Sequence, residues 1–156
     1  MNVTSWATWK RVQKEEASVA HIWLLQEHKM VNGYKLRDAK KQLAKDGWAS
    51  TFEAGVQTAD GGFSSGVAVL VSQAADLEEE LRIEKLTHRA VGAAFRYAGL
   101  RIAAWSLYGD TYDSKATEQL LKDVLASSGG RQDHLVIGGD FNAPPWHRQA
   151  VDCRQA

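Results

Sequence analysis

Short apolar stretches alternate with longer amphipathic ones along the chain, and this pattern predicts a series of strands and helices. We expect strands at residues 19–25, 48–53, 67–71, 82–87 and 134–139. The run VAVLV at residues 67–71 is continuously apolar, which is typical of a strand buried on both faces. Residues 90–97 and 100–108 flank Ala98-Gly99, which predicts a β-hairpin with its turn at that dipeptide.

Amphipathic periodicity predicts helices at residues 7–17, 36–45 and 114–126. In the second helix Leu36, Ala39 and Leu43 share one face, and Gly47 stands where a left-handed C-terminal cap would be. The expected apolar stripe of the third helix is Leu120, Leu121, Val124 and Leu125, and Gly129-Gly130 should end that helix. Such a series packs naturally as a mixed parallel and antiparallel arrangement of strands with helices outside.

Composition narrows the function classes only slightly. The 156 residues suffice for one domain with a core, and 19 Lys and Arg balance 19 Asp and Glu. This balance argues against a free-standing, tight DNA binder, but not against an enzyme that meets DNA in a local groove. Cys153 is the single cysteine, so an internal disulfide is excluded and an intracellular location is favoured. The chain has no apolar run of the roughly 20 residues that a membrane span needs, and its start does not resemble a signal peptide.

Candidate chemistry lies where two apolar strands give way abruptly to polar residues. The first such place is Leu25-Gln26-Glu27-His28-Lys29 and the second is Gly138-Gly139-Asp140-Phe141-Asn142. Strand ends are rigid and open onto clefts, and a carboxylate there is a suitable hard ligand for Mg²⁺. We expect the two glycines to let a phosphate or a metal approach the backbone closely.

These segments give the chain a resemblance to a known family. Residues 25–29 resemble the LQE-x-K motif of the exonuclease–endonuclease–phosphatase (DNase I-like) superfamily, and residues 139–142 match its GDFN motif. Weaker resemblances in the same order are residues 2–6 to the opening N-x-N-G-L segment, 66–71 to a GGVAILV-like strand and 106–109 to N-V-Y-x-P. The resemblance covers nearly the whole chain.

The resemblance implies a role for each matching residue. Glu27 would be the principal ligand of Mg²⁺, or of Mn²⁺ in its place, and Asn2 would support that site by hydrogen bonds. Tyr108 would contact the scissile phosphate. Asp140 would orient or deprotonate the attacking water, and Asn142 would bind a phosphate oxygen. This division of labour suits phosphodiester hydrolysis, which needs charge neutralisation, a base and neutral donors.

The chain also departs from the family pattern. Thr4 stands where many members have a second Asn or an Asp, and Gly109-Asp110 lacks the usual proline. Lys29 matches the motif lysine but receives no catalytic role. Family members end with an Asp-His segment, which residues 143–148 (APPWHR) do not supply. We therefore expect one incomplete domain over residues 1–156.

Two further patterns in the sequence have plainer interpretations than a catalytic or metal site. Residues 62–66 fit G-x-S-x-G, but a nucleophile elbow needs a strand before the serine and a helix after it, whereas a loop and a strand are expected here. Four residues could be imagined as zinc ligands, namely His28, His134, His147 and Cys153. They lack the close paired spacing of structural zinc sites, and surface or strand-edge histidines are the plainer interpretation.

Four tryptophans and one acidic run also have expected positions. Trp23 and Trp105 lie in strand patterns and are expected in the core. Trp6 and Trp146 follow motif positions, where either base stacking or packing would explain them. The acidic run at residues 76–80 is expected to be a solvated face or a loop.

The sequence thus predicts an α/β fold, a four-layer αββα DNase I-like sandwich of which the N-terminal half or somewhat more is present. The expected function is Mg²⁺-dependent phosphodiester hydrolysis, with DNA or another phosphodiester as substrate. The alternatives are an inactive fragment of a mobile-element polyprotein and a phosphatase of lipid or inositol phosphates. A mobile-element origin would imply a reverse-transcriptase region in the parent polyprotein and a nuclear location.

Overall fold

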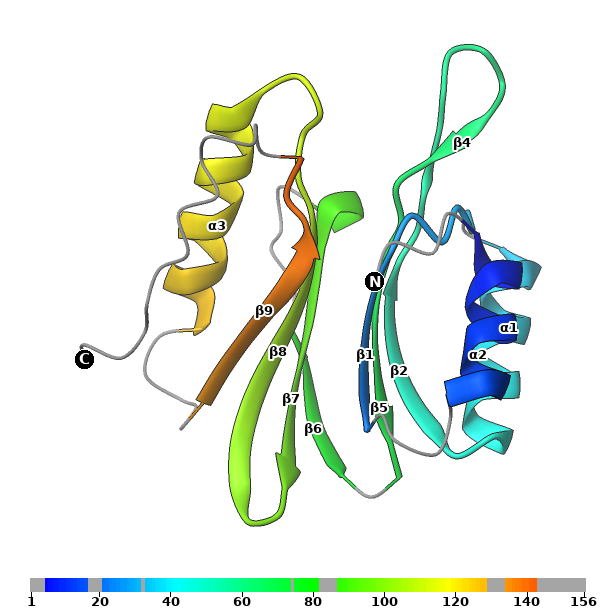
Figure 1. The fold of residues 1–156 in the computed structure, drawn as a ribbon, viewed down its shortest axis with the longest axis vertical. Helices are drawn as coiled ribbons and strands as arrows, with labels where there is room; N and C mark the ends of the chain where they lie inside the picture. Colours follow the sequence, from blue (N-terminus) through cyan, green and yellow to red (C-terminus); the bar gives the residue numbers. More distant parts are fainter. Residues whose placement is uncertain are drawn as a thin grey trace.

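The computed structural model describes residues 5–16, 21–31, 33–73, 75–81, 87–128 and 134–142. In chain order its elements are α1 (Trp6–Glu16), β1 (Ile22–Gln26), α2 (Tyr34–Lys45), β2 (Trp48–Glu53), β3 (Val56–Gln57), β4 (Phe63–Ser64), β5 (Val67–Ser72), β6 (Asp76–Leu81), the 3₁₀ turn η1 (Thr87–Arg89), β7 (Ala90–Tyr97), β8 (Leu100–Tyr108), α3 (Ser114–Ser128) and β9 (His134–Asp140). Two sheets face each other, with α1 and α2 outside one and α3 outside the other (Figure 1). This is the predicted helix–sheet–sheet–helix sandwich.

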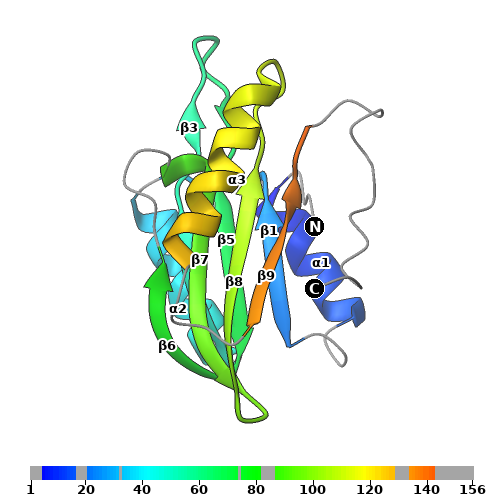
Figure 2. The ribbon, with the colours of Figure 1, turned by 90° about the vertical axis from the view of Figure 1, so that its left-hand side faces the viewer.

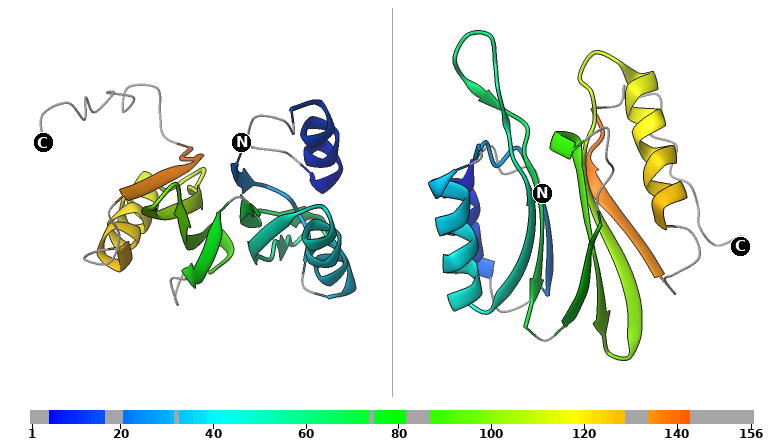
Figure 3. Two further views of the ribbon diagram at one scale, coloured as in Figure 1. Left: turned by 90° about the horizontal axis from the view of Figure 1, so that it is seen from below. Right: turned by 180° about the vertical axis from the view of Figure 1, so that it is seen from behind.

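The two sheets differ in strand direction. The first has the order β1-β5-β2 and is antiparallel throughout. The second has the order β6-β7-β8-β9, in which only the β8–β9 pair is parallel. Figure 2 shows α3 lying across the second sheet, and Figure 3 shows the two sheets from below and from behind. Because β8 and β9 are parallel, their C-terminal ends meet at one edge of the sandwich.

Three apolar cores separate the four layers. The central core lies between the sheets and contains Val69, Val91 and Phe95. A second core packs α1 and α2 onto the first sheet, and a third packs α3 onto the second sheet through Trp105 and Leu120. Each sheet is therefore buried on both faces, as the continuous apolar runs in the sequence predicted.

Local sequence explains where several elements turn or end. Ala98 (φ 50°) and Gly99 (φ 82°) both have positive φ, as a tight hairpin turn between β7 and β8 requires. Gly47 has φ 83° and follows α2, which confirms its predicted role as a left-handed cap. The Asp113 carboxylate accepts the backbone N–H groups of Lys115 (2.9 Å) and Ala116 (3.1 Å), so it caps α3.

Most predicted elements are confirmed. Of the two alternatives for residues 76–80, the loop is wrong, because their backbone pairs with β7 as strand β6. Asp76 and Glu78 are exposed, as the solvated-face alternative predicts. Leu125 is 49% exposed and does not belong to the stripe of α3. Of the strand expected at 19–25, residues 19 and 20 are not among those described, and Ile22–Gln26 forms β1. The strand expected at 82–87 falls outside the described residues except for Thr87, which begins η1.

Other expectations concern residues that the structure does not describe, namely Gly129-Gly130, Trp146, His147 and Cys153. The described helices are all too short or too polar to cross a membrane.

Candidate functional site

The two predicted strand ends meet at one edge of the sandwich. β1 ends directly before Glu27, and the parallel register of β8 and β9 places Tyr108 opposite Asp140. The Tyr108 hydroxyl donates a 2.5 Å hydrogen bond to Oε1 of Glu27. In Figure 1 this edge is the upper end of both sheets, where the β3–β4 hairpin projects beyond them. A hydrogen bond therefore joins the first sheet to the second within the candidate site.

The electrostatic surroundings keep the Tyr108 phenol protonated. Burial, followed by the hydrogen bond to Glu27 and the charge of that carboxylate, raises the pKa of Tyr108 to about 12. The charge of Asp140 also raises this pKa, which places a second carboxylate within electrostatic range. Tyr108 is therefore a hydrogen-bond donor across the ordinary pH range.

A tight turn fixes Asn142 beside Asp140. The backbone N–H of Asn142 donates to Oδ1 of Asp140 at 3.1 Å, and the residue has φ 47°. Its side-chain Nδ2 donates to the carbonyl of Gly109 at 2.8 Å. The Gly109 N–H donates in turn to the Asp140 carbonyl at 2.7 Å. The loop after β8 and the turn after β9 therefore hold each other in place.

Arg89 is a further member of this site that the sequence did not indicate. Its guanidinium donates to the Gly109 carbonyl at 2.9 Å and forms an ion pair with Asp110 at 2.9 Å. It also lies 5.7 Å from the centroid of the Tyr108 ring. These contacts join residues about twenty positions apart, and no short motif marks them in the sequence.

Positive φ angles concentrate around the same edge. Among the described non-glycine residues, φ is positive at Glu27 (58°), Lys29 (56°), Ser65 (57°), Asn142 (47°) and Ala98 (50°). All except Ala98, which forms the β7–β8 hairpin turn, belong to loops at the Glu27 and Asp140 strand ends. Backbone in this sparsely populated region is held by surrounding contacts and is common at functional sites.

His28 lies directly behind Glu27 and is not the surface or strand-edge histidine that we expected. Its side chain is 1% exposed. Burial lowers the pKa of His28 from 6.5 to about 4, so the ring is neutral. Nδ1 accepts the N–H of Met30 at 3.1 Å, which assigns the ring proton to Nε2, 3.0 Å from the Glu53 carbonyl.

A buried polar link ties the two sheets together behind the site. Nε2 of Gln26 donates to Oγ of Ser106 at 2.8 Å, and that hydroxyl donates to the Leu25 carbonyl at 2.8 Å. Gln26 and Ser106 are almost completely buried. This link fixes the end of β1 against β8 just below Glu27 and Tyr108.

The glycines before Asp140 do not serve the predicted purpose. A Cβ on Gly138 would lie 2.7 Å from Cδ1 of Leu24 in the opposite sheet. A Cβ on Gly139 would lie 2.1 Å from the Leu107 carbonyl oxygen of the neighbouring strand. Their space is taken by the protein itself, so these glycines serve packing and not the approach of a ligand.

The donor set at this edge is compatible with a hard cation. Glu27 and Asp140 are half-buried carboxylates, and Mg²⁺ is commonly bound by one or two carboxylates together with waters and substrate phosphates. No group of three or more His, Cys, Asp or Glu suited to a metal occurs within the described ranges. Asn2 lies outside the described residues.

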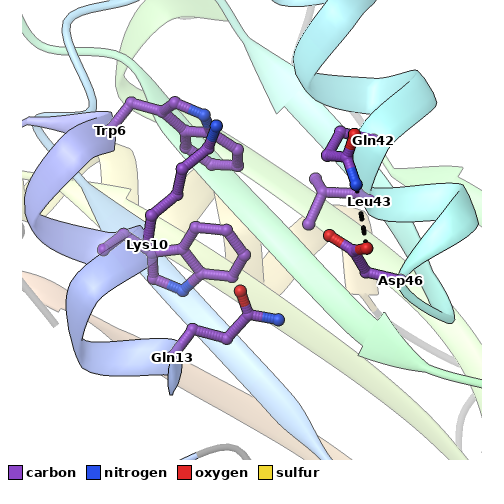
Figure 4. Close-up of a pocket in the computed structure, with 7 residues that line it drawn as sticks. Trp6, Lys10, Gln13, Gln42, Leu43 and Asp46 are labelled. Carbon is purple, nitrogen blue, oxygen red and sulfur yellow. Dashed lines mark hydrogen bonds between the residues drawn. The ribbon is translucent and has the colours of Figure 1, made fainter. Parts of the chain in front are cut away.

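A separate groove of about 320 Å³ lies between α1 and α2, on the outer side of the first sheet (Figure 4). Trp6 and Trp9 line it together with Lys10, Gln13, Gln42, Leu43 and Asp46. The Trp6 ring stacks on Trp9 at 4.5 Å and packs edge-on against Phe52 at 5.7 Å. These contacts favour the packing interpretation of Trp6 over base stacking. Trp23 and Trp105 are buried, as predicted.

Comparison with known proteins identifies a matching family. The profile of the Endonuclease/Exonuclease/phosphatase family matches residues 4–154. No curated protein sequence matches the chain.

Solved structures with the same fold include two nucleases and one further protein. An AP endonuclease from Archaeoglobus fulgidus has a TM-score of 0.64 and 20% identity over 92% of this chain and 56% of that one. The endonuclease domain of TRAS1, a telomere-specific non-LTR retrotransposon, has a TM-score of 0.56 and 20% identity over 94% of this chain and 58% of that one. A D. rerio TDP2 humanized by 14 mutations has a TM-score of 0.60 and 16% identity over 88% of this chain and 59% of that one. The chain thus spans less than two thirds of the length of each of these structures.

Proposed function

The chain belongs to the endonuclease/exonuclease/phosphatase family, and from this membership we propose that it contributes the metal-binding and phosphate-binding part of a nuclease that hydrolyses phosphodiester bonds. The observation that carries the proposal is the hydrogen bond from Tyr108 to Glu27 across the two sheets, with Asp140 opposite Tyr108. This contact gathers two carboxylates and a neutral donor at one edge.

Glu27 would hold Mg²⁺, with Asp140 as the second carboxylate nearby. The bound cation would supply neutralisation of the phosphate charge. Asp140 would take a proton from the attacking water while the water oxygen bonds to phosphorus and the bond to the leaving oxygen breaks. Tyr108, held protonated by its raised pKa, would donate to a phosphate oxygen, as would the amide of Asn142. Asn2 would support the Glu27 carboxylate.

Nucleic acid is the favoured substrate class. Two of the similar structures are named as an AP endonuclease and a retrotransposon endonuclease domain. With the TRAS1 likeness, we extend the proposal to a mobile-element origin, with a reverse-transcriptase region in the parent polyprotein and a nuclear location. The balanced charge implies that DNA is met at the local site and not over a broad basic surface.

A second candidate is that this chain lacks hydrolytic activity of its own. The chain spans 56–59% of the length of three similar structures, so much of each of those structures has no counterpart in it. The metal site could persist without turnover in such a chain.

Nicking of supercoiled plasmid, with Mg²⁺ or with EDTA, tests the first candidate. We expect Mg²⁺-dependent nicking by the chain or by a longer polypeptide that contains it, and a loss of about 100-fold or more in Glu27→Gln and Asp140→Asn. Glu118→Gln, on the exposed face of α3, is the matched control. Equal nicking by all four proteins would refute the assigned roles.

Parallel assays separate the remaining alternatives. Turnover of an inositol polyphosphate or of sphingomyelin, with no turnover of DNA or RNA, would favour the lipid or inositol phosphatase. Binding of Mg²⁺ that depends on Glu27, without turnover of any substrate, would favour the inactive candidate.

A further inference from the structure

We infer that His28 is a positioning residue that holds the Glu27 carboxylate in place through the buried turn that follows β1. The inference rests on the proposed function only in taking Glu27 as the metal ligand. The LQE-x-K pattern does not single out His28, because His28 occupies the variable position x of that pattern.

The turn after β1 has a backbone that L-residues seldom adopt unaided. Glu27 and Lys29 both have left-handed φ angles, 58° and 56°, and His28 stands between them. Two such residues on either side of one position persist only where surrounding contacts over-determine the backbone. The side chain of His28 supplies those contacts.

Both ring nitrogens of His28 are used inside the protein. Nδ1 accepts the N–H of Met30 at 3.1 Å, so the ring closes the turn on which Glu27 lies. Nε2 lies 3.0 Å from the carbonyl of Glu53 and 3.3 Å from that of Val67, at the ends of the neighbouring strands β2 and β5. The ring therefore fastens the Glu27 turn to both other strands of the first sheet.

The walls around the ring leave it little freedom to move. Phe52 packs edge-on against it, with centroids 5.4 Å apart. On another side a Cβ on Gly66 would lie 2.6 Å from Cε1 of His28, so only glycine admits the ring there. The backbone adds the N–H of His28 to the Gly66 carbonyl at 3.3 Å and the N–H of Lys29 to the Ser65 carbonyl at 3.1 Å.

The consequence for the site is that Glu27 has little backbone freedom of its own. Its carboxylate meets Tyr108 across the sheets only while the turn keeps its left-handed form. Substitution of a residue that does not touch the metal but orients one of its ligands typically changes metal affinity by about 10-fold to 100-fold. Loss of the His28 bonds should therefore appear at Glu27 and Tyr108, although His28 itself touches neither metal nor substrate.

Two substitutions divide the ring's functions. His28→Asn can keep the acceptor for the Met30 N–H but loses the donor to Glu53. His28→Gln can keep the donor but loses the acceptor. The matched control is His21→Asn, at the opposite end of β1, where Nδ1 makes an exposed contact of 3.2 Å with Ser72. Glu27→Gln serves as the reference for a lost carboxylate.

The first readout is the Tyr108 ring-carbon signal of ¹³C-tyrosine-labelled protein without metal, and the second is Mn²⁺ affinity from electron paramagnetic resonance. We expect both His28 variants to move the Tyr108 signal in the direction seen in Glu27→Gln and to weaken Mn²⁺ binding by about 10-fold. His21→Asn should change neither. A merely structural role would leave both readouts at the wild-type value in any variant that folds.

The outcomes separate this inference from the proposed function. Folded His28 variants with the wild-type Tyr108 signal overturn the inference. Equal Mn²⁺ binding by wild type and Glu27→Gln refutes the metal assignment, and the Tyr108 signal still decides the role of His28. If both His28 variants unfold, Phe52→Leu decides, because it loosens the packing of the ring and leaves both ring nitrogens in place, although it also removes the edge-on contact with Trp6. A wild-type Tyr108 signal in that variant would also overturn the inference.

Discussion

The candidate site is assembled from two halves that are held by different physical means. Glu27 projects from the first sheet on a strained turn fixed by the buried ring of His28. Tyr108 and Asp140 project from the second sheet, where the parallel register of β8 and β9 sets them side by side. On this second side the surrounding loops are held by Arg89, which is partly exposed to solvent.

This difference predicts different sensitivities. A solvent-excluded histidine network responds to pH but little to salt, because no net charge is involved while the ring is neutral. The stability that a partly exposed ion pair contributes depends on salt, whereas the pairing of two strands in register depends on the space between them. Each half should therefore be most sensitive to its own perturbation: acid for the first half, and steric change or salt for the second.

Steric change at the second half should have the largest effect. Gly139→Ala places a Cβ 2.1 Å from a backbone oxygen of Leu107, whereas Gly138→Ala meets the flexible end of Leu24 at 2.7 Å. We expect Gly139→Ala to lower the free energy of unfolding by about 3 kcal/mol and Gly138→Ala by about 1 kcal/mol. Urea denaturation of the two variants measures this. Equal losses would show that register does not limit the Asp140 side.

Acid should destabilise the first half through His28. The pKa of this residue is about 4 in the folded chain against 6.5 when unfolded, so the folded state disfavours the charged ring. The stabilisation is present above pH 6.5 and is lost as the pH falls from 6.5 through 4, by about 3 kcal/mol in all. Urea unfolding of metal-free protein across this range measures the loss.

His28→Gln provides the control, because it removes the titrating ring. Its stability should vary less with pH over the same interval than that of wild type, whatever its absolute value. An unchanged pH dependence would show that other groups cause the acid lability and that the first half is not distinguished in this way.

The sequence predicted the second half of the site better than the first. Asp140 was predicted from the end of a strand, and Tyr108 and Asn142 were predicted from the family resemblance. The register of two correctly placed strands brings Tyr108 and Asp140 together. At the first half the position of Glu27 was predicted, but not what holds it there. His28 was expected at the surface because a lone histidine after a strand carries no periodic signal.

The other features that the sequence did not predict share a physical cause. Arg89, the Gln26–Ser106 link and the occupied space beside Gly138 all depend on contacts between segments far apart in the chain. Local patterns report which face of an element is buried, but not which atom of a distant strand lies opposite. Strand β6 was missed because edge pairing with β7 outweighed an acidic composition that disfavours strands.

The Gln26–Ser106 link between the two sheets should make an intermediate contribution to the free energy of unfolding. Ser106→Ala removes the donor to the Leu25 carbonyl and leaves the buried Nε2 of Gln26 without its partner. We expect a loss of about 2 kcal/mol in the free energy of unfolding, measured by thermal and urea denaturation. Adding Gln26→Leu should recover part of it, because the unpaired amide is then gone. Simple additivity of the two substitutions would mean that the link is not a unit.

Removal of the ion pair at the second half should have the smallest effect on stability. Arg89 and Asp110 retain 25% and 27% side-chain exposure, and Asn142 still donates to the Gly109 carbonyl when the guanidinium is absent. We expect Arg89→Met to cost less than about 1 kcal/mol at low salt, and we expect that difference to shrink further in about 1 M NaCl. The acid destabilisation assigned to His28 should be the same in Arg89→Met as in wild type, because the two networks share no residue. If Arg89→Met instead altered the pH dependence, the two halves would be coupled through the contacts that join the sheets here, the Tyr108–Glu27 bond and the Gln26–Ser106 link.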